Sequence, residues 1–284
     1  MKGAQVCIKT GYTKDGDKMI SKVAAGGGEE TGNTGVVFVF DQKTLRLDTV
    51  LCDEGLLTEV RTAAACAYAS RFILGDRTNH IGKIGIVGGG VQAVWQLRLL
   101  GAGVVPSSCR TVVVKTRSRE SADAFMQRMK TSSYPPDREW EFEHYESVVD
   151  GGHGFKECQL IHTLTQSRAP VLSLEDVCIP DASKDEKQFL HITAAGADSP
   201  GKCELDPDLI REASELICDS IPQSKVRGEF QAEDFWDRLR EIGSMSESPT
   251  RSETSRSSFT IFDSSGLPLQ DVEMANLVFS KTLT

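Results

Sequence analysis

Short segments rich in β-branched and apolar residues open the chain, and clusters of turn-forming residues separate them. This pattern is typical of paired β-strands. The dipeptide Asp15-Gly16 predicts the first turn, and the glycine-rich positions 26–28 and 32–33 predict the second. The expected strands are Gln5–Tyr12, Lys18–Ala24, Gly35–Phe40 and Leu47–Cys52.

Helical and strand-like patterns alternate along the following two hundred or so residues. Alanines favour a helix over Thr58–Leu74, and apolar strands then take turns with amphipathic helices. Such alternation predicts an α/β fold in which a parallel sheet is covered on both faces. The expected strands are Lys83–Val87, Thr111–Lys115, Gln159–Thr165, Leu190–Ala194 and Glu215–Asp219, and the expected helices are Gln92–Leu100, Arg119–Lys130 and Asp208–Glu212.

The last part of the chain predicts two more helices separated by a polar segment. Phe230–Ile242 and Asp271–Leu283 carry helical patterns. Between them, Gly243–Ser258 is rich in serine, glutamate and arginine and has almost nothing to bury, so we expect a mobile loop there. Apolar character returns at Phe259–Phe262.

Composition narrows the classes of partner. The 284 residues carry a net charge of −9, which argues against nucleic acid or an anionic membrane as the main partner. No apolar run approaches a membrane span, and the first residues have no signal core, so we expect a soluble, cytoplasmic protein. The 8 cysteines form no C-x-x-C pair, which leaves a zinc site without support and favours free thiols.

A glycine-rich turn follows the apolar strand Ile84–Val87 and precedes a predicted helix. It reads G-x-G-x-x-A, a variant of the dinucleotide-binding fingerprint. Gly88 permits the tight turn, Gly90 lets the backbone approach a pyrophosphate, and Ala93 lets the helix pack on the strand. The alternative is a glycine-rich turn in an unrelated α/β protein. The flanking strand and helix favour the first interpretation, a Rossmann-type domain.

The end of the next strand suggests which cofactor is bound. An NAD-preferring site usually has an acidic residue there, whereas this chain reads Lys115-Thr116-Arg117-Ser118-Arg119. Arg117 can bind a 2′-phosphate bidentately, so NADP(H) is favoured and NAD(H) stays possible. The alternative is that these cations are only a solvated helix start, although cations there oppose the helix dipole.

Four segments of the chain form a pattern that is specific in order and spacing: Leu51–Ala65, Ile86–Ala93, His191–Lys202 and Phe262–Leu267. Together they resemble the ornithine cyclodeaminase / mu-crystallin family, and the resemblance spans nearly the whole chain. It implies an NAD(P)-binding Rossmann domain at residues 79–263. It also implies a smaller α+β domain for substrate binding and dimerisation, built from residues 1–78 and 264–284 and N-terminally short.

The resemblance also implies roles for individual residues. Arg61 matches the arginine that holds the substrate carboxylate, Lys22 a lysine facing the substrate, and Asp198 the catalytic acid/base. Chemistry agrees, because arginine suits a carboxylate and a carboxyl group after a parallel strand can move a proton at a C–N centre. The alternatives are a surface ion pair for Arg61, an exposed strand lysine for Lys22, and a turn residue for Asp198. The residues expected beside the cofactor are Thr62, Gly88, Gly90, Val91, Gln92, Arg117, Thr163, Thr165, Ser264 and Gly266.

Three functions fit these expectations. The first is an imine reductase, in which NADPH reduces a cyclic ketimine or imino acid. The second is an ornithine cyclodeaminase, an ammonia-lyase that converts L-ornithine to L-proline and ammonia with bound NAD. The third is a non-catalytic, NADPH-dependent binder of small ligands. The first two make the chain an enzyme acting on a small amino or imino acid, and the family resemblance implies a homodimer formed through the sheet of the first domain.

Overall fold

Two units make up the computed structural model, and both ends of the chain belong to the first. The structure describes residues 5–26, 34–131, 138–147, 149–180, 188–246 and 259–282. Unit 1 is Met1–Ala65 with Gly266–Thr284, and unit 2 is Cys66–Ser265. Most of the predicted loop Gly243–Ser258, namely residues 247–258, lies outside the described residues. In the described parts, no helix combines the length and apolarity that a membrane span needs.

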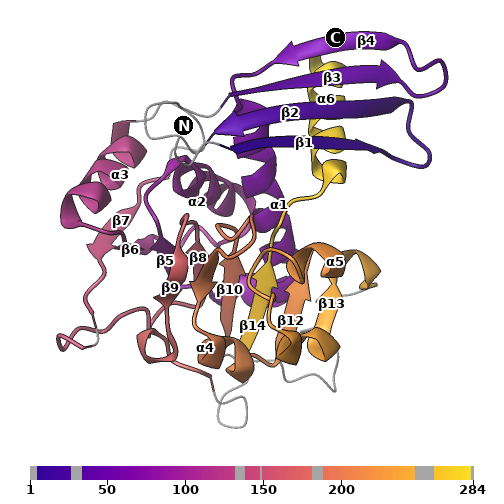
Figure 1. Cartoon of the computed structure of the whole chain (residues 1–284). Helices are drawn as coiled ribbons and strands as arrows, with labels where there is room; N and C mark the ends of the chain where they lie inside the picture. Colours follow the sequence, from indigo (N-terminus) through magenta and orange to yellow (C-terminus); the bar gives the residue numbers. More distant parts are fainter. Residues whose placement is uncertain are drawn as a thin grey trace. The chain divides into compact units, whose positions relative to one another are not determined.

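Unit 1 contains an antiparallel sheet and confirms the four strands expected there. Its strand order is β1-β2-β3-β4, and α6 lies against one face of it (Figure 1). The strands are β1 (Gln5–Tyr12), β2 (Lys18–Gly26), β3 (Thr34–Asp41) and β4 (Leu47–Cys52), and the helices of the unit are α6 (Pro268–Thr282) and the start of α1 (Leu56–Leu74).

A small apolar core joins α6 to this sheet. Ile20, Val37 and Val39 are buried against Val272 and Ala275 of the helix. Because side chains alternate between the faces of a strand, the positions between these buried ones point to the opposite face. The sheet of unit 1 therefore has one face covered by α6.

Unit 2 is built on an eight-stranded sheet in which all neighbouring strands are parallel, as the alternating pattern predicts. The order is β13-β12-β14-β10-β8-β5-β6-β7. A separate parallel pair joins β9 (Arg168–Leu172) to β11 (Cys203–Leu205). The strands of the large sheet are β5 (Lys83–Val87), β6 (Thr111–Lys115), β7 (Glu141–His144), β8 (Leu160–Thr163), β10 (Leu190–Ala194), β12 (Glu215–Cys218), β13 (Leu239–Glu241) and β14 (Phe259–Asp263).

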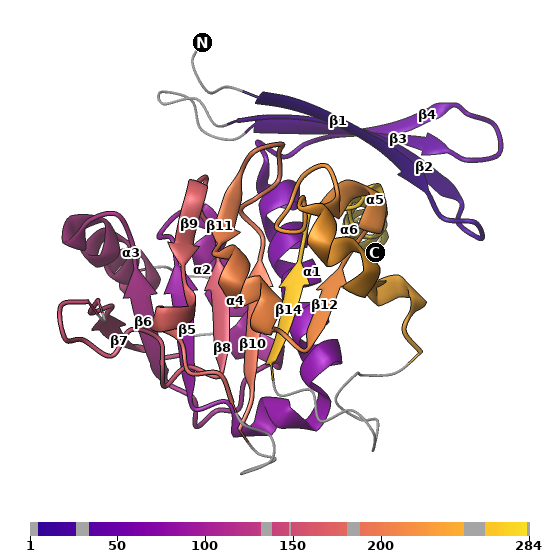
Figure 2. The same cartoon turned by 60° about the horizontal axis from the view of Figure 1, so that its bottom comes forward.

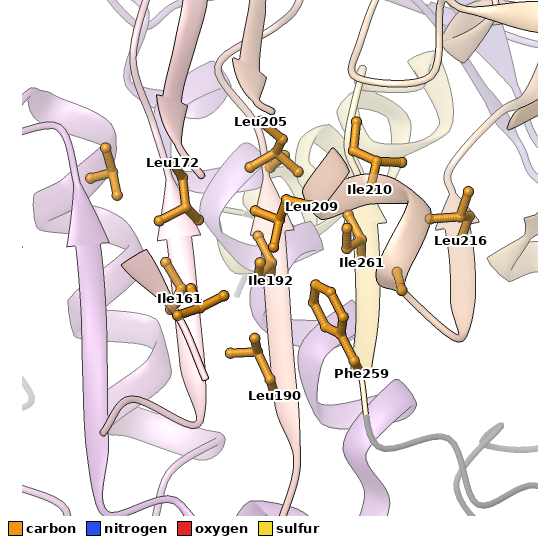
Figure 3. Packing of buried hydrophobic residues seen from close by; sticks show 14 of the residues in the cluster. Ile161, Leu172, Leu190, Ile192, Leu205, Leu209, Ile210, Leu216, Phe259 and Ile261 are labelled. Carbon is orange, nitrogen blue, oxygen red and sulfur yellow. The ribbon is translucent and has the colours of Figure 1, made fainter. Parts of the chain in front are cut away.

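Both faces of the large sheet are covered by apolar contacts. Leu209 of α4 belongs to the same buried cluster as Ile192 and Ile261 (Figure 3), and α2 packs on the opposite face through Leu97 (Figure 2). The central strands are therefore buried on both sides, as expected for a covered parallel sheet. The helices of the unit are α2 (Val91–Gly103), α3 (Arg119–Thr131), α4 (Pro207–Glu212) and α5 (Ile221–Ser224), besides the end of α1.

The helix predicted over Phe230–Ile242 is wrong. Only the 3-10 turn Glu233–Arg238 is helical there, and the next residues form the edge strand β13. Phe230 and Phe235 are buried in the core, and the backbone of β13 pairs with β12. Tertiary packing and a strand partner thus override the helical pattern. The sequence also gave no sign of the short strands β7, β9 and β11.

A chain of buried polar side chains crosses one face of the large sheet. Each member is at most 1% exposed, and consecutive members lie 2.8–3.5 Å apart. This row of hydrogen-bonded side chains connects the helices α1 and α2 with three strands of the large sheet, whose carboxyl ends lie at the same edge. In order, its members are Gln96 of α2, His162 of β8, Ser70 of α1, Thr193 and His191 of β10, and Thr260 of β14.

The amide oxygen at one end sets the direction of this chain. Gln96 Oε1 can only accept, so His162 donates from Nδ1 and its Nε2 accepts from the Ser70 hydroxyl. Burial lowers the pKa of both His162 and His191 to about 3, and His191 adds to the effect on His162. Both rings are therefore neutral at physiological pH.

We predict that His191→Gln flattens the pH dependence of the unfolding free energy below pH 6.5. The folded-state pKa of His191 lies below its unfolded value of about 6.5, so unfolding takes up a proton and stability falls as the pH falls. The contribution is about 1.4 kcal/mol per pH unit between pH 6 and 4. The raised pKa of Asp263, about 8, acts in the opposite sense but is common to both proteins.

Urea unfolding at several pH values measures this difference. His80→Gln is the matched control, because His80 is exposed. A slope in His191→Gln equal to that of the unmodified protein would contradict the prediction.

Candidate active site

The fingerprint turn between β5 and α2 has the backbone that its glycines predict. Gly88 has φ +104°, and a Cβ there would lie 2.9 Å from the carbonyl oxygen of Leu164. Its N–H donates to the carbonyl of Lys115 at 2.8 Å, which ties the turn to the end of β6. Only glycine combines this φ with so close an approach.

The second fingerprint glycine leaves open space at a helix N-terminus. Gly90 is the N-cap of α2, and a Cβ on it would meet nothing within 4 Å. Val91 and Gln92 begin the helix, whose first turn holds no acidic residue. Ala93 is completely buried. The free N–H groups and the open space fit a pyrophosphate, so the residues present suit a dinucleotide.

Arg117 differs from Lys115, the cation before it, in its contacts with the protein. Lys115 lies 3.4 Å from Asp176 and 4.2 Å from the ring centre of Tyr145, so its charge is already engaged. Arg117 is exposed, and no ion pair joins it to the described residues. Its guanidinium is therefore available to a phosphate.

Backbone hydrogen bonds continue the parallel ladder past the carboxyl ends of four strands. The N–H of Leu164 donates to Val87 at 2.8 Å and that of Ala195 to Thr163 at 3.0 Å. The N–H of Ser264 donates to Ala194 at 2.9 Å. The segments after β5, β8, β10 and β14 thus lie side by side. They contain the predicted residues Gly88, Thr165, Asp198 and Ser264.

A buried carboxyl group, Glu204, holds two of these segments together. It accepts hydrogen bonds from Thr163 Oγ1 at 2.8 Å, Thr165 N at 2.5 Å and Gly196 N at 2.9 Å. Burial raises the pKa of Glu204, whereas the hydrogen bonds act against this rise. The hydroxyl of Thr163 is thus committed to the protein itself. Glu204 was not predicted as a site residue, because its partners Thr163 and Gly196 lie 41 and 8 residues away in the sequence.

Asp198 lies in the turn after β10 and has a cationic partner. Its Oδ1 accepts from Lys202 Nζ at 2.6 Å; the side chain of Asp198 is 50% exposed and that of Lys202 only 5%. Lys202 also donates to Gln166 Oε1. The carboxylate is held on one oxygen and open to solvent, which suits a group that must exchange a proton. The spacing of four residues was a signal for Lys202 that the sequence interpretation missed.

Unit 1 contains a second set of predicted residues. Lys22 and Arg61 are 2% and 7% exposed, so neither is the exposed or surface group that the alternatives described. Lys22 Nζ and Arg61 Nε lie 2.6 and 3.0 Å from the same Oδ1 of Asp271, and Arg61 Nη1 donates to Gln270 at 2.7 Å. Burial lowers the pKa of Lys22, and Arg61 lowers it further. Asp271 was not predicted from the sequence.

For three further predicted residues, the structure shows their conformation or their contacts within the protein. Thr62 donates its hydroxyl hydrogen to the carbonyl of Thr58 at 2.8 Å within α1. Ser264 is buried, and its hydroxyl lies 3.5 Å from Asp219 Oδ2. Gly266 has φ +82° and belongs to unit 1. Their roles beside a cofactor therefore stay predictions.

A cavity of about 400 Å³ lies elsewhere in unit 2. Its lining includes Lys83, Arg119, His144 and His153, and none of the fingerprint residues. Lys83 is paired with Glu157 at 2.8 Å. Because the cavity holds none of the fingerprint residues and not Asp198, the carboxyl edge of the sheet is the stronger candidate site.

Comparison with known proteins agrees with this geometry. An alanine dehydrogenase of Archaeoglobus fulgidus is 28% identical over 238 residues, which cover 82% of this chain and 66% of that protein, slightly less than two thirds of its length. An iminosuccinate reductase of Paracoccus denitrificans is 29% identical over 249 residues, covering 85% of this chain and 68% of that protein.

The fold is also similar to that of solved structures. An archaeal alanine dehydrogenase dimer with bound NAD superimposes with a TM-score of 0.75 at 22% identity, covering 99% of this chain and 86% of that one. The sequence profile of the ornithine cyclodeaminase/mu-crystallin family matches residues 33–284, which is most of the chain. The chain therefore belongs to the ornithine cyclodeaminase/mu-crystallin family, as the four resembling segments indicated.

Proposed function

We propose that this protein is an NAD(P)-dependent imine reductase that reduces a cyclic ketimine or another imino acid with NADPH. The observation that carries the proposal is the alignment of the fingerprint turn at Gly88 with the segment that bears Asp198 at one edge of the sheet. The turn that would bind the dinucleotide and the carboxylate that would transfer the proton can then act on the same substrate. The similarity to an iminosuccinate reductase supports this choice.

The cofactor proposal assigns unit 2 to NAD(P) binding. Gly88, Gly90 and the first turn of α2, with Val91 and Gln92, would hold the pyrophosphate. Arg117 would bind the 2′-phosphate of NADP(H). A bound nicotinamide supplies hydride to the carbon of a C=N bond. The further contacts expected from the resemblance, at Thr62, Thr163, Thr165 and Ser264, belong to the same proposal.

Asp198 is proposed to transfer the proton at the reacting nitrogen. Lys202 keeps one carboxylate oxygen in place through a 2.6 Å contact, and the other is left for the substrate. Thr165 and Gly196 are fixed by Glu204, so the turn before Asp198 is held by buried hydrogen bonds. General acid–base catalysis needs such a positioned group.

Unit 1 is proposed to bind the carboxylate of the substrate. Lys22 and Arg61 share one oxygen of Asp271, so their two positive charges are only half neutralised by it. A guanidinium pairs with a carboxylate through parallel N–H donors. This polar cluster thus suits an amino or imino acid.

An ornithine cyclodeaminase is the second candidate, favoured by the segment from Asp53 to Thr62, which resembles bacterial members of that name. It would use the same residues, and it would yield L-proline and ammonia from L-ornithine without net change of the cofactor. Following the nicotinamide absorbance with imino acids and assaying proline from ornithine separates the two. Tight NADPH binding without either reaction would instead favour a non-catalytic binder.

We also propose a cytoplasmic location. All eight cysteines are free, which agrees with it.

One prediction concerns the affinity for the cofactor. Arg117→Ala should raise the Kd for NADPH about 10- to 100-fold, since a charge-assisted hydrogen bond contributes about 1.5–3 kcal/mol. The Kd for NADH should change little. Gly90→Ala is the matched control: its Cβ meets no protein atom, so folding should be kept while both cofactors bind more weakly. Fluorescence titration measures these constants, and equal weakening by Arg117→Ala would refute its role.

A second prediction concerns the proton. Asp198→Asn keeps the shape and removes the basicity, so kcat for imino-acid reduction should fall about 10²- to 10⁴-fold. The Kd for NADPH should stay within about twofold, because the fingerprint is unchanged. Asp208→Asn, an exposed aspartate of the same unit, is the control. Near-normal turnover in Asp198→Asn would show that another group transfers the proton.

We also propose a homodimer, formed through the face of the unit 1 sheet opposite α6. Val6 and Ile8 are each 69% exposed there, and Tyr12 is 64% exposed. The archaeal alanine dehydrogenase of similar fold is a dimer. Exposed apolar side chains gathered on one sheet face are typical of an interface.

Ile8→Glu should therefore convert the dimer into a monomer at micromolar concentration, because a buried charge opposes association. Sedimentation velocity measures the change. Val226→Glu, at a position 60% exposed in unit 2, should leave the dimer intact. If the unmodified protein already sediments as a monomer, the dimer proposal fails.

A further inference from the structure

One cation of unit 1 has no part in the expected site. Lys9 lies on β1 directly opposite Lys22 on β2, and strand alternation turns both side chains toward the face that carries α6. A Cβ on Gly11, two residues along the same strand, would lie 2.7 Å from the Cβ of Pro268 at the start of α6, which identifies the face. Lys9 thus belongs to the same polar cluster as Lys22.

Lys9 and Arg61 converge on one point. A Cβ at Gly266 would lie 2.9 Å from Lys9 Nζ, 2.8 Å from Arg61 Nη1 and 3.5 Å from Arg61 Nη2. The two cationic groups are therefore near neighbours. Residue 266 is a glycine with φ +82°, where a side chain would be strained and would force the ends of Lys9 and Arg61 to shift.

The charges of this cluster do not balance. Lys22 and Arg61 contact Asp271, whereas Lys9 donates to the carbonyl oxygen of Gly266 at 2.8 Å. Among the described residues, no carboxylate is paired with Lys9. Three cations and one carboxylate leave a surplus of positive charge in a partly buried place, and such a surplus favours the binding of an anion.

We propose that Lys9 is a further substrate-binding residue, which holds the substrate carboxylate jointly with Arg61 beside Gly266. The proposal rests on the proposed function, because it names a contact of that same carboxylate. It also gives Gly266 a role in unit 1, because a side chain there would displace the two cationic groups. A carboxylate presents two oxygens, one for the ammonium group of Lys9 and one for the guanidinium of Arg61.

The charge of Lys9 gives the site a dependence on pH. Burial, together with the positive charge of Arg61, lowers the pKa of Lys9 to about 8. Asp271 raises it, Lys22 lowers it and Cys7 raises it. Above pH 8 the free protein therefore loses this cation, and a carboxylate should bind more weakly there.

The test compares two probes that differ in the carboxylate alone, L-proline and L-prolinamide. Calorimetry with the full chain measures their Kd for the unmodified protein and for Lys9→Met, Lys9→Arg and Lys14→Met. Lys14 lies in the same hairpin and is exposed, so it is the matched control. Thermal melting of each variant checks that it is folded.

We expect Lys9→Met to weaken L-proline about 10- to 100-fold and to leave L-prolinamide unchanged. Lys9→Arg should keep most of the affinity and carry it above pH 9, where the unmodified protein loses it. Lys14→Met should have no effect. A residue that only supports the fold would instead lower the melting temperature and affect both probes alike.

Two results overturn the proposal: unchanged L-proline affinity in folded Lys9→Met, or an unmodified protein that does not prefer L-proline to L-prolinamide. The function proposal fails separately. Lys9-dependent binding of L-proline without turnover of any imino acid or of ornithine would refute the enzyme and leave the role of Lys9 standing.

Discussion

Parallel pairing of β5, β8, β10 and β14 forces four chain segments, far apart in sequence, to emerge at one edge of the sheet. In a parallel ladder all strands run the same way, so the residues after each strand become neighbours. The backbone hydrogen bonds continue one step beyond the strands, from Leu164 to Val87 and from Ser264 to Ala194. The fingerprint turn and the turn bearing Asp198 depend on this arrangement.

Buried acids hold that edge without buried cations as partners. Glu229 accepts from the backbone N–H groups of Glu204 and Leu205, and Asp263 accepts from that of Glu229. Burial raises the pKa of Glu229 well above its usual value, and Glu204 raises it further. Gly228 has φ +91° and leaves room for Asp263, since a Cβ would strike that carboxyl group. Hydrogen bonds from backbone N–H groups thus stabilise the three buried acids Glu204, Glu229 and Asp263.

Unit 1 differs from the carboxyl edge because it holds several positively charged side chains close together. Asp271 lies 249 residues after Lys22 and comes from the other end of the chain, yet it is the carboxylate that both Lys22 and Arg61 contact. Removing charge from water is unfavourable unless a partner is close, so this shared acid makes the cluster possible. The surplus positive charge that remains is the basis of the proposed binding of an anionic ligand.

The sequence by itself determined whatever depends on neighbours along the chain. The pattern of apolar residues predicted the parallel strands, and the spacing of the glycines predicted the turn at Gly88 and Gly90. The turn at Asp15-Gly16 is also consistent with the pairing of Lys9 with Lys22 across the hairpin. Only the tertiary structure decided which acids and bases meet. Glu204 and Asp271 find their partners through strand order and through a helix from the other chain end, and Leu239–Glu241 became a strand because β12 offered an open edge.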